Sequence, residues 1–158
     1  MANKKIGIFD SGIGGLTVFK SIQSKFPHYD YIYFADSMHM PWGSLNKKKL
    51  INITDKIIKF FIQQDVDILI PGCNTSNSLL MPYIKEKFPH SFNFISSACN
   101  EIIKKYKNHR FGLFGTVNTV NSNIYKYYFD RYNLPIYQVS CPKLVPIIEK
   151  KILSHKLI

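Results

Sequence analysis

The sequence has 158 residues, of which 46% are hydrophobic and 20% are charged, an ordinary globular composition that suits one domain better than two. Its formal net charge of +11 would fit nucleic acid, an anionic membrane surface or an acidic small substrate. The lysines, however, stand in short groups at polar positions of predicted helices, without an aromatic-interleaved RNA motif or helix-turn-helix spacing. We interpret them as solvated helix faces and expect no nucleic-acid partner.

The apolar runs, the N-terminus and the cysteines indicate where the chain is located and whether its thiols are free. No run reaches the roughly 18 consecutive apolar residues of a membrane span, and the N-terminus lacks a signal-peptide profile. We therefore expect a cytoplasmic chain without membrane contact. Cys73, Cys99 and Cys141 are an odd number at wide spacing without a CxxC pair, which favours free thiols over disulfides or a metal site.

Short β-branched or aromatic runs alternate with longer segments of helical period along the chain. The predicted strands cover residues 5–9, 31–34, 67–70, 92–95, 110–114 and 136–139. The clearest helix covers residues 45–64, and others begin near Gly15, Asn74, Ala98, Asn118 and Pro142. This order predicts an α/β fold with a mainly parallel sheet flanked by helices. A weakly marked boundary near residue 95 divides the chain into residues 1–95 and 96–158.

The residues after each strand are the ones to read for function, because ligands of such sheets bind beyond the carboxyl ends of the strands. The first strand leads into Asp10-Ser11-Gly12-Ile13-Gly14-Gly15, a glycine-rich turn whose backbone N–H groups suit an anion such as a carboxylate. A tight turn in which Asp10 or Ser11 caps the next helix explains the same residues equally well.

The second predicted strand leads from Asp36 into a loop in which Trp42 stands beside Gly43. We expect His39 of this loop to be a surface residue, because no second metal-type residue stands at ligand spacing.

The third strand leads into Cys73-Asn74-Thr75, which places a thiol at the start of a helix. A helix start stabilises the thiolate, and such a thiol can act as a base near neutral pH. A buried structural cysteine is the usual alternative. Asn74 and Thr75 favour a site, because they supply hydrogen bonds to a polar ligand. After the fifth strand, Thr116 and Thr119 offer further hydroxyls, and helix capping explains one of them.

Five strings in this order resemble the glutamate racemase family, within the aspartate and glutamate racemase group. They are Asp-Ser-Gly-x-Gly-Gly-Leu at residues 10–16, Asp-x-x-x-x-Pro-Tyr-Gly at 36–43, Cys-Asn-Thr at 73–75, Gly-Thr-x-x-Thr-x-x-Ser-x-x-Tyr at 115–125 and Cys-Pro-x-x-Val-Pro-x-x-Glu at 141–149. The resemblance covers about residues 5–150 and implies the first racemase domain with the beginning of the second.

The resemblance implies inversion at the α-carbon of glutamate by two cysteines on opposite faces of that carbon. No cofactor is involved, and the product supplies D-glutamate for peptidoglycan and thus for cell wall and cell shape. Cys73 would take the proton from D-glutamate, and Asp10 beside it would help with that proton. The implied substrate-binding residues are Asp10, Ser11, Trp42, Gly43, Asn74, Thr75, Thr116 and Thr119.

Two departures from the family pattern bear on activity. Trp42 replaces the family's tyrosine at a place where largely the backbone meets substrate, so activity need not be lost. The family's second cysteine lies in a Gly-Cys-Thr-His-Tyr-Pro segment that this sequence lacks, and neither Cys99 nor Cys141 is a convincing substitute. We therefore expect a truncated racemase that does not racemise alone. Its uncovered sheet edges should lower stability or lead to association with another chain, including a homo-oligomer.

Two other functions stay open. A non-catalytic binding protein would keep the anion-binding strand ends for an amino acid or a protein partner, and it predicts glutamate binding without proton exchange. A nucleotide-binding domain is suggested by Gly12-Ile13-Gly14 and by Asp36 at the end of the next strand. Thr17 occupies the place of the third glycine, and Cys73 would be left without a purpose, which disfavours this function.

Overall fold

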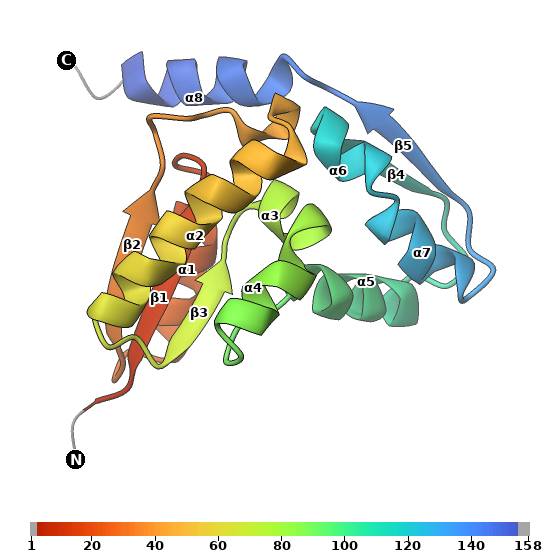
Figure 1. Ribbon diagram of the computed structural model, residues 1–158. Coiled ribbons are helices and arrows are strands. Elements are labelled where there is room, and N and C mark those ends of the chain that lie inside the picture. Colours follow the sequence, from red (N-terminus) through yellow and green to blue (C-terminus); the bar gives the residue numbers. More distant parts are fainter. Residues whose placement is uncertain (1–2, 155–158) are drawn as a thin grey trace.

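The strands form two separate parallel sheets in the computed structural model of the protein (Figure 1). The structure describes residues 3–154 and, of their side chains, those of residues 3–150. The strands are β1 (Lys5–Asp10), β2 (Asp30–Ala35), β3 (Ile68–Pro71), β4 (Phe111–Gly115) and β5 (Ile136–Ser140). The first sheet has the order β2-β1-β3, and the second contains β4 and β5. The predicted α/β fold with parallel strands flanked by helices is confirmed.

Helices connect the strands in the manner of βα units. They are α1 (Gly15–Lys25), α2 (Lys47–Gln63), α3 (Asn74–Leu79), α4 (Met81–Lys87), α5 (Phe94–Lys105), α6 (Val117–Asn121), α7 (Ile124–Asp130) and α8 (Leu144–Ser154), with a 3-10 turn η1 (Trp42–Ser44). We call the part from β1 to α4 the first half and the part from α5 to α8 the second half. Within the described residues, no helix is both long and apolar enough to cross a membrane.

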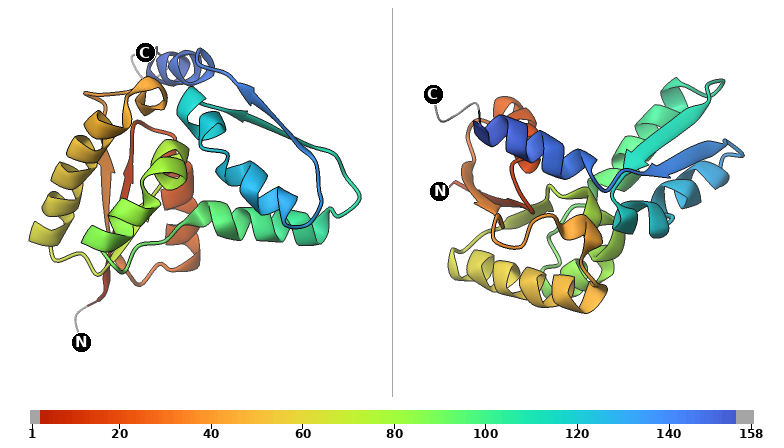
Figure 2. Two further views of the ribbon diagram at one scale, coloured as in Figure 1. Left: turned by 45° about the vertical axis from the view of Figure 1, so that its right-hand side comes forward. Right: turned by 90° about the horizontal axis from the view of Figure 1, so that it is seen from above.

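The first sheet lies between α1 and α2, which cover opposite faces (Figure 2). Strand β2 has aromatic side chains on both faces of the sheet, because successive side chains of a strand point in opposite directions. Tyr31 and Tyr33 pack against Phe19 of α1. Phe34, on the other face, packs against Phe60 of α2.

Helix α2 supplies most of the first core. Its predicted apolar stripe is buried, with Leu50, Ile57 and Phe61 at most 3% exposed. The helix begins where Asn46 accepts a hydrogen bond of 2.9 Å from the backbone N–H of Lys49, which satisfies one of the free donors of the first turn.

The second half has a smaller core, formed by Ile95, Cys99, Ile103 and Phe129. Helices α5 and α7 provide it, and partly buried residues of β4 and β5 pack against it. From β5 the chain enters α8, which runs back over the carboxyl ends of the first sheet (Figure 1). The second half therefore contacts the first near the ends of its strands.

The predicted strand at residues 92–95 is wrong, because helix α5 begins there. Asn93 caps this helix by accepting a hydrogen bond of 2.9 Å from the backbone N–H of Ile95, and only an isolated bridge joins Leu69 to Ser91. The helix predicted near residue 98 thus starts four residues earlier. The division at residue 95 stays a prediction and would fall inside α5.

Candidate active site

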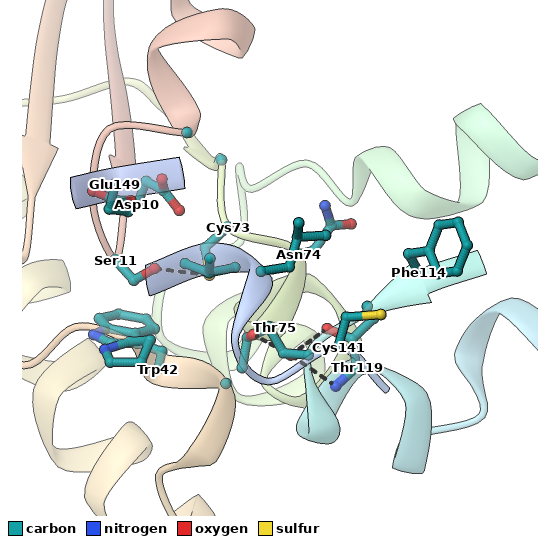
Figure 3. Close-up of a pocket in the computed structure, with 18 of the residues that line it drawn as sticks. Asp10, Ser11, Trp42, Cys73, Asn74, Thr75, Phe114, Thr119, Cys141 and Glu149 are labelled. Carbon is teal, nitrogen blue, oxygen red and sulfur yellow. Dashed lines mark hydrogen bonds between the residues drawn. The ribbon is translucent and has the colours of Figure 1, made fainter. Parts of the chain in front are cut away.

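The carboxyl ends of the strands open onto a cavity of about 330 Å³ (Figure 3). All the residues predicted to form the site line it: Asp10, Ser11, Trp42, Gly43, Cys73, Asn74, Thr75, Thr116 and Thr119. They come from the turns after β1, β3 and β4 and from the loop after β2. The residues after β1, β2 and β3 are brought together because these parallel strands end at the same edge of the first sheet. Thr116, which follows β4 of the second sheet, joins them through its contact with Thr75.

The turn after β1 is held by its own aspartate. Asp10 is buried, and its Oδ2 accepts a hydrogen bond of 2.7 Å from the backbone N–H of Gly15, the first residue of α1. The N-cap position of α1 is Gly14, so neither Asp10 nor Ser11 is the N-cap residue that the sequence suggested, but Asp10 binds a free N–H group of the first turn. On the other side of the turn, the hydroxyl of Tyr33 donates to the carbonyl of Gly12 at 2.8 Å. Ser11 points from this turn toward Cys73 (Figure 3).

Cys73 follows β3 at the N-cap position of α3. The chain reaches it through Gly72, where a Cβ atom would lie 3.1 Å from the Cα of Gly15, so a side chain there would push the two turns apart. This close approach places Sγ of Cys73 3.7 Å from the hydroxyl oxygen of Ser11. The hydroxyl of Ser76 donates to the carbonyl of Cys73 at 2.9 Å and fixes the backbone beneath the thiol.

Three threonine hydroxyls meet where the two halves touch. Thr116 is the N-cap of α6, and its Oγ1 accepts a hydrogen bond of 3.2 Å from the backbone N–H of Thr119. The same oxygen lies 3.1 Å from Oγ1 of Thr75 and 3.0 Å from Oγ1 of Thr119. Capping therefore explains Thr116, as expected for one of the pair. The hydroxyl chain joins α3 of the first half to α6 of the second.

The loop after β2 forms another wall of the cavity. Trp42 is fully buried, and its Nε1 donates to Oδ2 of Asp36 at 2.9 Å. Nδ1 of His39 lies 2.9 Å from Oδ1 of the same carboxylate. The His39 side chain is 33% exposed and does not line the cavity, so we assign it no part in the site.

Known proteins resemble this chain in sequence and in structure, although no family model matches it. It is 33% identical to the glutamate racemase of Aquifex aeolicus over 97% of the chain and 35% identical to that of Carboxydothermus hydrogenoformans over 98%. It also resembles the crystal structure of the Francisella tularensis glutamate racemase in complex with D-glutamate. That match has a TM-score of 0.84 and 30% identity over 95% of the chain. Over nearly its whole length, the chain is therefore a homologue of glutamate racemases.

The match covers only part of these racemases. The chain spans 64% of the Aquifex aeolicus protein, 58% of the Carboxydothermus hydrogenoformans protein and 57% of the Francisella tularensis structure. The aspartate racemase of Picrophilus torridus, at 20% identity and a TM-score of 0.61, shares the fold alone.

The thiol of the candidate racemase site holds its proton more tightly than a free cysteine does. Burial raises the pKa of the Cys73 thiol, and the charge of Asp10 raises it further. Three hydrogen bonds lower this pKa, but by less than burial and Asp10 raise it. They come from the backbone N–H groups of Ser76 and Thr75 and from the hydroxyl of Ser11. The sequence predicted that the helix start stabilises the thiolate. The donors at the helix start do lower the pKa, but the net pKa is raised, because α3 has only six residues and the thiol is buried.

Sequence reasoning missed a buried carboxylate in this cavity. Glu149 of α8 is buried, lines the cavity and accepts a hydrogen bond of 3.2 Å from the backbone N–H of Ile13 (Figure 3). Burial raises the pKa of Tyr33, and the charges of Asp10 and Glu149 raise it further, so both carboxylates lie near this phenol. The signal was in the sequence, since Glu149 closes the last of the five racemase strings.

Tyr125 and Cys141 of the second half also line the cavity. Tyr125 donates a hydrogen bond of 2.6 Å to Oδ1 of Asn74, and burial raises the pKa of Tyr125 to about 12. Cys141, which was not assigned to the site from the sequence, lines the cavity as well. Cys99 lies in the second core, where burial raises its pKa to about 11.

Proposed function

We propose that this chain carries the part of a glutamate racemase site that removes the α-proton of D-glutamate. The observation that supports the proposal is the position of Cys73 in one cavity with hydroxyl and backbone donors suited to carboxylates. The Francisella tularensis relative was crystallised with D-glutamate. The reaction would need no cofactor, would take place in the cytoplasm and would serve peptidoglycan synthesis.

The proposed chemistry is proton transfer at the α-carbon. The thiolate of Cys73 takes the α-proton and becomes a thiol, while the electron pair of the broken C–H bond moves onto the substrate carboxylate. Donors on that carboxylate stabilise the charge as it forms, and we assign this task to Asn74, Thr75 and Thr119. Return of a proton from Cys73 to the same face restores D-glutamate.

Substrate binding would also prepare the base. After burial, the charge of Asp10 is the next largest cause of the raised pKa of Cys73. The ammonium group of a bound amino acid beside Asp10 would offset this charge and lower the pKa of the thiol. Asp10 thus helps with the proton of Cys73 through its charge, and Glu149 is placed to pair with the same ammonium group.

Inversion needs a proton donor on the opposite face of the α-carbon. The 158 residues do not contain the Gly-Cys-Thr-His-Tyr-Pro string in which the family carries its second cysteine. We therefore expect this chain to exchange the α-proton of D-glutamate without inverting it.

The test is proton NMR of D-glutamate and of L-glutamate incubated with the chain in heavy water, followed by chiral analysis of the recovered amino acid. We expect deuterium at the α-carbon of D-glutamate, no inversion, and loss of exchange in Cys73→Ser. Cys99→Ser is the matched control, because Cys99 lies in the second core. Inversion by the wild-type chain would show that another group, such as Cys141, supplies the opposite face.

The raised pKa of Cys73 favours one alternative, a protein that binds glutamate without chemistry. A thiol that keeps its proton even with substrate bound cannot act as a base. Binding measured by calorimetry together with an absence of exchange for both isomers would support this alternative and contradict the racemase proposal. Absence of both binding and exchange would exclude both functions for this chain.

A further inference from the structure

The loop that carries Trp42 is fixed at a second point, from the other half of the molecule. The side-chain amide of Asn118 donates to the carbonyl of Trp42 at 3.1 Å and to the carbonyl of Leu45 at 2.8 Å. These carbonyls flank the η1 turn, and Nδ2 has two hydrogens, so one amide group binds both ends of the turn. Asn118 is half-buried on α6, which follows β4.

Close packing at the same place supports this connection. A Cβ atom at Gly43 would overlap with the side chain of Thr116, so the loop lies against the start of α6 with no room for a side chain. Thr116 in turn contacts Thr75 of the first half. The two hydrogen bonds from Asn118 therefore hold the η1 turn at a place where it already packs against α6.

The indole ring of Trp42 is held by a different partner from the one that binds the backbone of the loop. Trp42 stands where the family has tyrosine, and its Nε1 donates to Asp36. Its backbone carbonyl is bound by Asn118. Side chain and main chain of this residue are thus held from opposite halves, and both Trp42 and Gly43 line the cavity.

We propose that Asn118 is a positioning residue, which holds the Trp42–Gly43 wall of the cavity in place from the second half. Asn118 itself does not line the cavity, so it acts through the loop. The ligand part of this inference rests on the proposed function, because it takes D-glutamate as the molecule bound in the cavity. The placement of the loop does not depend on that assignment.

The chain provides its own probe, because Trp42 is its single tryptophan and is fully buried. Asn118→Asp keeps the shape of the side chain but replaces the donor group with an oxygen that repels both carbonyls. Asn121→Asp, on the exposed side of the same helix, introduces the same charge without this contact. We expect a red shift of the tryptophan emission and faster acrylamide quenching in Asn118→Asp, and neither change in Asn121→Asp.

Ligand binding is the second readout. We expect the affinity for D-glutamate to fall about tenfold in Asn118→Asp, the equivalent of one to two hydrogen bonds, and to stay unchanged in Asn121→Asp. Asn118→Ala, which removes the donors without adding charge, should give the same direction in both measurements.

The outcomes separate this inference from the proposed function. Tryptophan emission and quenching that stay at wild-type values in folded Asn118→Asp and Asn118→Ala would overturn the positioning role. A lower melting temperature with unchanged emission of the folded state would show a structural role only, and would also overturn it. If wild type fails to bind D-glutamate, the proposed function fails, while the emission comparison still decides the role of Asn118.

Discussion

The reactivity of Cys73 depends on a balance between burial, one neighbouring charge and a few donors. Burial is the largest cause of the raised pKa of Cys73, and the charge of Asp10 is the second. We predict that Asp10→Asn lowers this pKa, because it removes that charge. The fold of the turn should persist, since an asparagine oxygen can still accept the N–H of Gly15. Alkylation of Cys73 by iodoacetamide at pH 7, followed by mass spectrometry of its peptide, should become several-fold faster.

Asp30→Asn is the matched control for this prediction. Asp30 is exposed at the start of β2, away from the strand ends that form the cavity, so its charge should not affect Cys73. Equal alkylation rates in wild type and Asp10→Asn would contradict the electrostatic account.

Cys99 should make stability depend on pH. Its pKa is raised to about 11 by burial, so the folded state binds this proton more tightly than the unfolded state does. The resulting stability is fully present below about pH 8.5, the ordinary range of a thiol, and is lost as pH rises through 11. We expect up to about 3 kcal/mol from this residue.

The measurement is the free energy of unfolding in urea between pH 8 and pH 11 for wild type and Cys99→Ala. The variant is less stable at pH 8 because it leaves a small cavity, but its stability should fall less steeply with pH. Parallel curves for the two proteins would contradict the assignment.

Most of the site could be predicted residue by residue, because parallel strands present their carboxyl ends at one edge. Asp10 and Cys73 were predicted in this way, and they line one cavity with Thr116, which follows β4 of the separate second sheet. Glu149 and Tyr125 close two of the racemase strings but were missed, because they lie on helices well beyond the strand ends and no local pattern shows where such a helix crosses a sheet. The raised pKa of Cys73 also needed the structure, since burial cannot be read from a helix start.

At the scale of elements, alternation and helical period located five of six predicted strands. They failed at residues 92–95, where Phe-Asn-Phe-Ile has the composition of a strand. There the cap at Asn93 starts a helix instead. The close contact between the η1 turn and α6 was not predictable either, because it joins elements from different halves.

This contact between η1 and α6 gives a prediction at the element scale. Gly43→Ala should destabilise the protein by about 1–3 kcal/mol, because the added Cβ would overlap with Thr116 and force the two elements apart. Gly112→Ala is the control, since its Cβ would meet nothing closer than an oxygen of Tyr137 at 4.0 Å. Urea unfolding of both variants checks this, and equal stabilities would show that α6 moves aside at little cost.

On the scale of the whole molecule, the two halves differ in how well they are covered. Strand β1 is paired on both sides, and fourteen buried residues form the core of the first half. Among the residues that the structure describes, the second half has a two-stranded sheet and four buried core residues. Phe114, Tyr137 and Val139 are at least 50% exposed, so an apolar part of its sheet faces solvent. The expectation of low stability or association stays a prediction, and this exposed apolar part of the second sheet is one surface that an associating chain would cover.

Amide hydrogen exchange should show this difference directly. Local opening is easiest where few buried contacts hold a segment, so amides of β4 and β5 should exchange faster than those of β1. Gly43→Ala, which loosens the contact with α6, should accelerate β4 and β5 while leaving β1 nearly unchanged. Equal protection in both sheets would mean that the contacts through Thr75, Asn118 and Glu149 are strong enough to make the two halves open as one unit.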